Sequence, residues 1–376
     1  MFHIDTRTYI YIFRIIVAAV FFVVFFLSEN LPVKAQPQIG GKYSFAFLNL
    51  PNSARAAALG TYQPASLPND PDIALGWLNP ALLNPQMHRQ ISAQYAWLPA
   101  NIGHANFMAA HNYDSTTTLA LGFQSVNYGD IPLTDDAGNT LGNFKAGDHA
   151  IYFGGGHSLG PFSIGVMTKF AFGNIESYKA NAFAFDLGGV WQGKDNWVVG
   201  LVAKNMGAQL KNYYDSNEPL PFDLQLGVSK KLTYLPLRIS GIAHHLHRWN
   251  LRYNDPALKP VNIFDTDTNQ TEKAYFFDKL TRHLAFSAEL TIAKVLRLQA
   301  SYNHLKRREM RINNIGSMAG FSLGGGIYTK KFCVQYAYTP YSVAQTANTI
   351  GLQVNLNNWL IKKTPTPKDI NNTPAH

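Results

Sequence analysis

The residues whose types could do chemistry are few, and their spacing argues against a reactive centre. His244, His245 and His247 are spaced closely enough for a metal ion. On a strand, however, His244 would point away from the other two, and no Cys or paired carboxylate completes a ligand set. Asp265 and Asp267 form a D-x-D pair, but the Gly and terminal Glu of an EF-type calcium loop are missing. The histidines are interpreted as a cluster at the barrel rim and the D-x-D pair as part of an ordinary solvated loop, and no metal or other cofactor is expected.

Glycine-rich and cysteine-based motifs give no better lead. The triplets at 154–156 and 324–326 precede neither a helix nor a Lys-Ser/Thr pair, so they are expected to relieve crowding or bend strands rather than hold phosphate. The single cysteine, Cys333, cannot form an internal disulfide and is expected to be a small residue on one strand face. The sequence therefore predicts that the protein is not an enzyme.

The elements that would position these residues are strands. Charged residues make up only 15 % of the chain, whereas Gly, Tyr and Phe are abundant, a bias that suits strands facing lipid. Apolar and polar residues alternate with a period of two, most clearly at 162–171, 222–229, 296–303 and 349–356. Weaker copies of the pattern lie between these segments. The predicted fold class is all-β: a transmembrane antiparallel β-barrel of about 14 strands. The alternative, a soluble β-sandwich, would expose more Lys, Glu and Thr.

Loop lengths support the barrel independently. Connections after even-numbered strands are roughly two to five residues long, while most of those after odd-numbered strands are longer, as in outer-membrane barrels. An even strand number returns both chain ends to one side, which is expected to be the periplasm. The long loops, expected to face outside, are 129–144, 206–221, 248–281 and 305–316.

Three segments lie outside the predicted barrel, which spans 89–358. Residues 1–35 are predicted to be a signal peptide cleaved after Ala35, because Arg14 precedes an uncharged apolar run at 15–27. A membrane anchor is the alternative, but it would have to bury Arg14. Residues 36–88, rich in Pro, Asn, Ala and Gly, are predicted to be a lumen plug, and residues 359–376 a disordered periplasmic tail.

The charge balance points to an anionic surface or partner. The formal charge of +9 falls to about +8 without the signal region, which holds three basic and two acidic residues. Nucleic acid is not expected behind a secretory signal, whereas lipopolysaccharide or an acidic protein is. The candidate contacts lie in the basic loop 305–316: Lys306, Arg307, Arg308 and Arg311.

Between about residues 40 and 358 the sequence resembles the PorQ family, outer-membrane components of the type IX secretion system. The resemblance is carried by residues 40–51 (GGKYSFAFLNLP), 79–85 (NPALLNP), 126–130 (VNYGD), 144–147 (FKAG) and 218–222 (EPLPF). Within the second of these, Asn79, Pro80 and Ala81 also resemble the plug motif of the wider FadL-like barrel class, whose members have fourteen strands.

The resemblance implies a scaffold rather than an enzyme. PorQ-like barrels hold the surface protein PorZ beside PorU and PorV, in a complex that joins secreted cargo to anionic lipopolysaccharide. The transpeptidase chemistry belongs to PorU. Two other functions stay open: a FadL-like transporter of hydrophobic small molecules, and a PorV-like shuttle for the C-terminal signals of cargo.

Overall fold

The computed structural model describes residues 43–67, 69–214, 218–251, 276–310, 318–342 and 345–360. All of them belong to one compact unit. The predicted signal peptide with its cleavage site after Ala35, the Asp265 and Asp267 pair, and most of the predicted tail lie outside the described residues. Within the described ranges, no helix is long and apolar enough to cross a membrane.

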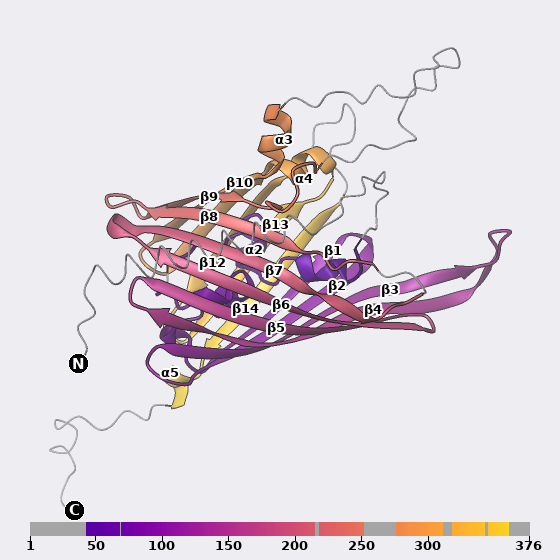
Figure 1. The fold of residues 1–376 in the computed structure, drawn as a ribbon, viewed down its shortest axis with the longest axis horizontal. Helices are drawn as coiled ribbons and strands as arrows, with labels where there is room; N and C mark the ends of the chain where they lie inside the picture. Colours follow the sequence, from indigo (N-terminus) through magenta and orange to yellow (C-terminus); the bar gives the residue numbers. More distant parts are fainter. Residues whose placement is uncertain are drawn as a thin grey trace, which may run out of the picture. The chain divides into compact units, whose positions relative to one another are not determined.

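Fourteen antiparallel strands close into a barrel in which neighbours in sequence pair and β1 pairs with β14 (Figure 1). The strands are β1 (Gln90–Leu98), β2 (Ile102–Asn112), β3 (Thr117–Thr134), β4 (Thr140–Leu159), β5 (Phe162–Ile175), β6 (Tyr178–Gln192), β7 (Trp197–Lys211), β8 (Asp223–Lys231), β9 (Leu237–Ala243), β10 (Leu284–Ile292), β11 (Leu296–Asn303), β12 (Phe321–Tyr328), β13 (Phe332–Pro340) and β14 (Thr346–Asn355). The predicted fold class is confirmed.

The two faces of the wall differ as the period-two pattern predicted. In β5, Ile164 and Phe170 are 47 % and 43 % exposed on the outside, whereas Ser163 and Lys169 are buried on the inside. Large apolar side chains are exposed in the same way on the other strands. So wide an apolar belt suits contact with lipid rather than water. The protein is therefore an integral barrel of the outer-membrane type.

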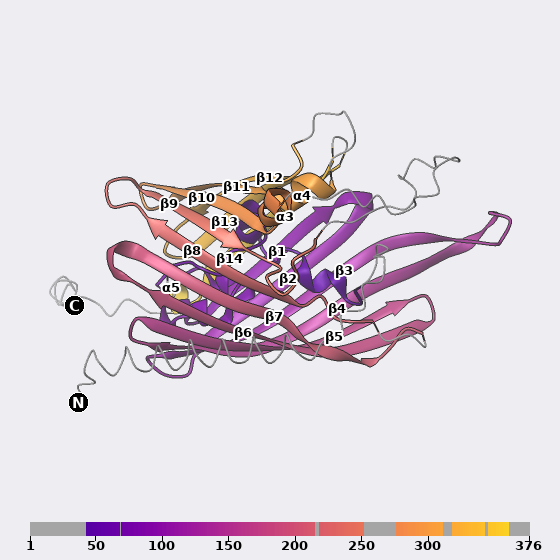
Figure 2. The ribbon, with the colours of Figure 1, turned by 45° about the horizontal axis from the view of Figure 1, so that its top comes forward.

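The connections differ between the two ends of the barrel (Figure 2). The connections after even-numbered strands are short, and we call that side the short-turn end: 113–116, 160–161, 193–196, 232–236, 293–295 and 329–331. The opposite side, the long-loop end, carries the connections 244–283 and 304–320, which include helices α3 (Phe276–Arg282) and α4 (His304–Glu309). Two connections at this end are single turns: η5 (Pro99–Asn101) between β1 and β2, and residues 176–177 between β5 and β6.

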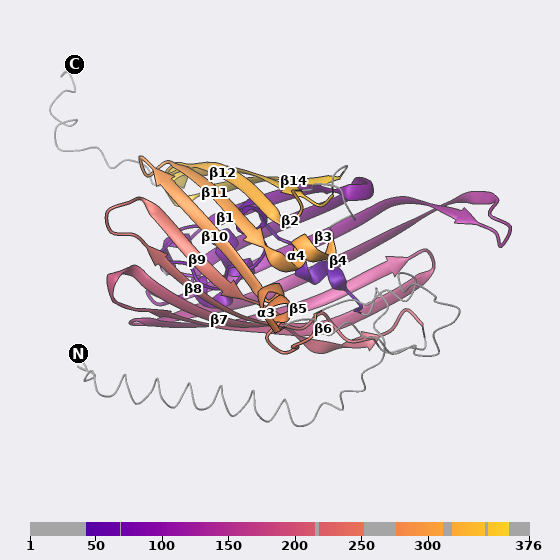
Figure 3. The ribbon, with the colours of Figure 1, turned by 90° about the horizontal axis from the view of Figure 1, so that it is seen from above.

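Two of the predicted long loops are shorter than expected. β3 continues to Thr134 and β4 begins at Thr140, so most of 129–144 forms a ribbon that extends beyond the neighbouring strands (Figure 3). β7 likewise continues to Lys211, into the predicted loop 206–221. In the ribbon, β3 pairs with β2 only as far as Asn127, and β4 pairs with β5 only from Ala146 onward, so no other strand pairs with either edge beyond those points. The ribbon is therefore not part of the closed wall, where one face meets lipid and the other the lumen, and its sequence does not alternate.

Residues 43–88, called the plug below, form five short helices inside the barrel: η1 (Ala46–Asn49), α2 (Ala54–Ala58), η2 (Ile73–Trp77), η3 (Pro80–Leu82) and η4 (Pro85–Met87). Four of these begin at a side chain that accepts a hydrogen bond from the helix backbone, namely Ser53, Asp72, Asn79 and Asn84. α2 packs against β11 to β14, and η3 packs against β4, β5 and β6. Helices this short depend on the wall for stability.

Two helices lie at the short-turn end. η6 (Lys194–Asn196) forms the turn between β6 and β7, and α5 (Asn357–Leu360) follows β14. α5 overlaps the first residues of the predicted disordered tail, so the chain is still helical where the tail was expected to begin. The rest of that tail, 361–376, lies outside the described residues.

Candidate functional site

The plug is fastened to the wall by a buried arginine. Arg55 lies on α2 and is 1 % exposed. Its guanidinium donates to Asp70 at 2.7 Å, to Asp72 at 2.8 Å and to Glu289 at 3.0 Å. The first two acceptors belong to the plug, whereas Glu289 belongs to β10. Arg55 therefore joins two turns of the plug to the barrel wall.

Two arginines of the wall pair with the same carboxylates. Arg238 of β9 bonds to Glu289, and Nη1 of Arg297 on β11 donates to both carboxylate oxygens of Asp70 at 3.1 Å. We call these six charged residues, three cations and three anions, the lumen ion cluster: Arg55, Asp70, Asp72, Arg238, Glu289 and Arg297. The cluster is balanced in charge, which is what burial of so many ions requires.

Two neutral side-chain amides from β13 and β14 donate to Asp72 of the cluster. Gln335 of β13 donates to Asp72 at 3.2 Å, and Gln353 of β14 donates to its other oxygen at 2.5 Å. At Asp70, burial raises the pKa, but the opposed effect of Arg55, Arg297 and Arg238 outweighs it and leaves the pKa of that carboxyl well below its usual range. Asp70 is therefore held in its charged form.

A second contact holds the plug from the opposite wall. Lys204 of β7 donates to the backbone carbonyl of Trp77 in η2 at 3.0 Å. Beside it, the buried Lys169 pairs with Asp186 at 2.7 Å. Because Lys204 comes from β7, whereas the lumen ion cluster uses β9, β10 and β11, the plug is bound on both sides of the lumen.

The predicted plug motif lies against the wall. Asn79 is fully buried; its Oδ1 accepts from the Ala81 amide at 3.0 Å, and its Nδ2 donates to the Pro64 carbonyl at 2.9 Å. The turn sits where the wall has glycines: a Cβ on Gly188 would lie 1.8 Å from Asn79 Oδ1 and one on Gly165 would lie 2.3 Å from Pro80. The motif therefore makes a close backbone approach to β5 and β6.

The four candidate basic residues do not form one free surface. Lys306 turns toward the plug and donates to Thr61 at 2.8 Å, while Arg308 pairs with Asp278 of α3 at 2.9 Å. Arg307 lies on the same helix, α4. Arg311 lies outside the described residues. Of the four, Arg308 is shown by the structure to present its charge at the surface, where it is 42 % exposed.

The histidine cluster is not on a strand, which corrects the face assignment made from the sequence. β9 ends at Ala243, and His245 has a positive φ of 55°. The Nδ1 atoms of His244 and His245 lie 2.8 Å apart, and the plug's Tyr62 stacks on His244. Burial lowers the pKa of His244 well below its ordinary value, which keeps the ring neutral. The described residues contain no group of three or more side chains suited to a metal ion.

Sequence reasoning missed two features. A Gly-x-Ser-x-Gly pattern does occur at 156–160, but it ends β4 and turns directly into β5, so the helix that would follow a nucleophile elbow is absent there. The lumen ion cluster was also missed. Its signals were a lone Arg55 among alanines and single charges at lumen positions of β9 and β10, since isolated charges inside membrane strands need partners.

Comparison with known proteins gives similarity of fold only. No protein-family model matches the sequence. No curated protein matches it either. Solved structures that resemble it include the Pseudomonas putida toluene transporter TodX, with a TM-score of 0.47 and 12 % identity, covering 80 % of this chain and 96 % of TodX.

Two further barrels resemble it at similar or lower levels. A Pseudomonas aeruginosa FadL homologue has a TM-score of 0.45 and 10 % identity, covering 81 % of this chain and 98 % of its own. The KdgM porin has a TM-score of 0.32 and 8 % identity, covering 70 % of this chain and 98 % of its own. Similarity at this level carries no information on what this barrel binds or transports.

Proposed function

We propose that the protein is a closed, non-enzymatic outer-membrane scaffold that holds a surface protein through its long-loop end. The observation that carries the proposal is the fastening of the plug: Arg55, Asp70 and Asp72 bond to wall residues on β9, β10, β11, β13 and β14. A conducting barrel needs a free lumen, whereas here the chain itself occupies that space. With the lumen filled, the surfaces left to bind another protein in the aqueous phase are the two ends of the barrel.

The long-loop end offers a surface for a protein. Trp249, Phe276 and Phe277, which we call the aromatic patch, are 50 %, 60 % and 74 % exposed. The Trp249 and Phe276 rings lie 5.6 Å apart, and those of Phe276 and Phe277 lie 5.9 Å apart. Large aromatic side chains dominate the binding energy of protein interfaces, and clustered exposure of this kind is typical of such a surface.

The helices beneath the patch are fixed to each other and are basic. Asp278 of α3 pairs with Arg282 at 2.8 Å and with Arg308 of α4 at 2.9 Å, so the two helices are linked. Lys306 turns toward the plug, but the four other basic residues of the pair still outnumber the acidic Asp278 and Glu309: Lys279, Arg282, Arg307 and Arg308. A partner with an acidic surface would complement this charge.

The specific partner in this proposal is a PorZ-like surface protein, within a complex that also contains PorU and PorV. The resemblance of residues 40–358 to the PorQ family supports it. In such a complex the barrel positions its partner at the cell surface, with the long-loop end outside and both chain ends in the periplasm, while PorU attaches cargo to anionic lipopolysaccharide.

The test is co-purification of the full-length barrel with its partner in mild detergent. Phe276→Ser with Phe277→Ser should reduce recovery of the surface protein at least about tenfold, because one hot-spot aromatic contributes about 2 kcal/mol and about 1.4 kcal/mol corresponds to a tenfold change in affinity. Tyr234→Ser is the matched control, since Tyr234 is 97 % exposed in the β8–β9 turn at the opposite end. Full recovery with the double variant would refute the docking role of the patch.

The competing functions give different results. A transporter of hydrophobic small molecules predicts an uptake defect on deletion, with normal attachment of cargo. A shuttle for cargo signals predicts that the purified barrel binds the C-terminal signal directly. Either result, with no stoichiometric surface protein recovered from the wild type, would replace the scaffold.

A further inference from the structure

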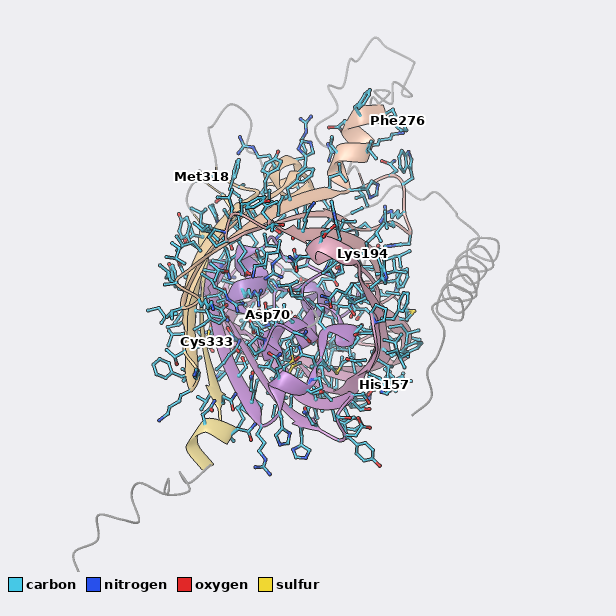
Figure 4. The ribbon with its side chains drawn as sticks, turned by 90° about the vertical axis from the view of Figure 1, so that its left-hand side faces the viewer. Asp70, His157, Lys194, Phe276, Met318 and Cys333 are labelled. Atoms are coloured by element: carbon cyan, nitrogen blue, oxygen red, sulfur yellow. The ribbon has the colours of Figure 1, made fainter. Side chains whose placement is uncertain are left out.

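A cavity of about 380 Å³ opens at the short-turn end, away from the proposed docking surface. Figure 4 looks into this end, where Asp70 of the plug lies within the ring of strands. The inner lining is buried and includes Asp70, Arg238 and Glu289 of the lumen ion cluster. The outer lining is exposed and comes from the turns that hold Lys231 and Lys294.

The cavity lining carries an excess of positive charge. Four cations line it, Lys231, Arg238, Lys294 and Arg297, against two anions. The two anions, Asp70 and Glu289, are already engaged by guanidiniums of the lumen ion cluster. Neither lysine has an ion pair or hydrogen bond through its ammonium group to another described residue. The site therefore has unused cations and no unused carboxylate.

Arg297 adds donors of fixed direction. Its Nη1 is committed to Asp70, and its guanidinium stacks on the Tyr328 ring at 4.0 Å. Nη2 makes no hydrogen bond to a described residue, and Nε is buried without a partner among them. A guanidinium with an unused Nη2 amino group beside a cavity is suited to carboxylate or phosphate oxygens, and the Tyr328 ring keeps it oriented.

We propose that this cavity binds a small anionic solute through carboxylate or phosphate groups. A volume of about 380 Å³ lies within the range of small-molecule sites and exceeds what a single anion needs. A metal ion does not suit the lining, since both carboxylates already accept from arginines. An apolar ligand does not suit it either, because the lining includes Gln192, Asn196 and Thr291 with no hydrogen bond from their side chains to another described residue.

The test is calorimetric titration of the full-length barrel in a nonionic detergent with citrate and, separately, inorganic phosphate. The expected result is saturable binding of at least one probe, and the tighter of the two identifies carboxylate or phosphate chemistry. Lys231→Gln with Lys294→Gln should weaken binding about tenfold, since each exposed charge contributes modestly. Both lysines are exposed, so the variant should fold, which circular dichroism checks.

Lys194→Gln is the matched control, because Lys194 lies on the neighbouring β6–β7 turn and does not line the cavity (Figure 4). It should bind as the wild type does. Absence of saturable binding of both probes would overturn the site, and so would a double lysine variant that binds no worse than the control. Neither outcome touches the docking of a protein at the long-loop end.

Discussion

Arg55 connects a short segment of chain to the barrel wall. It lies on a five-residue helix, a length that is not stable in isolation. Its guanidinium stays charged and offers donors in a planar fork, so it can satisfy three carboxylates where a lysine ammonium would be less directional. Those carboxylates are almost fully buried, which makes each of them costly without a cation.

Replacing Arg55 tests this role at the scale of one residue. Arg55→Met should lower the free energy of unfolding by about 3–5 kcal/mol, because Asp70, Asp72 and Glu289 lose a buried partner. Urea unfolding of the barrel in lipid vesicles, followed by tryptophan fluorescence, measures it. Arg308→Met is the control, since its exposed pair with Asp278 should contribute at most about 1 kcal/mol. Equal losses for the two variants would show that the buried cluster has no special role.

The sequence predicts which face of the wall carries Arg297, but not the partners that form the cluster. Alternation in β11 placed Arg297 and Gln299 on the lumen face, and there they bond to Asp70 and Glu289. Arg55 could not be placed in this way, because the partner that it finds on the wall, Glu289, is 234 residues away in the chain. The local alternation predicts on which face of a strand a residue lies, whereas its ion-pair partner depends on how the plug folds inside the barrel.

At the scale of elements, the wall was predictable because lipid imposes a rule on every strand. The rule fails in the ribbon of β3 and β4, which no other strand flanks and where the sequence is rich in Asp, Asn and Gly. The plug helices follow another rule, capping by Ser, Asp and Asn, and in the sequence only the stretch 53–60 indicates such a helix. Their docking depends on glycines of the wall.

Two adjacent glycines of β6 test whether the plug depends on close contact with the wall, because a Cβ would meet the plug at only one of them. Gly188→Ala would put a Cβ 1.8 Å from Asn79 Oδ1, so the plug motif must shift, with an expected loss of about 1–3 kcal/mol from overpacking. Gly189→Ala is the control, because nothing lies within 4 Å of its Cβ position. The comparison combines urea unfolding with proteolysis of the plug. If both variants resist protease as the wild type does, η3 is not held by close contact with β6.

At the scale of the whole molecule, plug and wall form one body. The ion pair between Arg55 and Glu289 requires β10, and the bonds from Asp72 to Gln335 and Gln353 require β13 and β14. The plug can therefore reach its final contacts only after nearly the whole chain has assembled. Composition indicated a segment ahead of the first strand, but only the assembled barrel shows that this segment is fastened on both sides of the lumen.

A plug fastened in this way should leave the barrel electrically silent. In planar lipid bilayers, the wild type is expected to give no sustained ohmic current, because the plug occupies the lumen and the lumen ion cluster holds it there. A variant lacking residues 43–88 should give steady, large conductance once refolded, since a fourteen-stranded barrel without a plug encloses a water-filled channel. Arg55→Met, which keeps the plug but loosens it, should give brief intermediate openings. A wild-type conductance equal to that of the deletion variant would mean that the plug leaves the lumen in the membrane and that the barrel works as a channel.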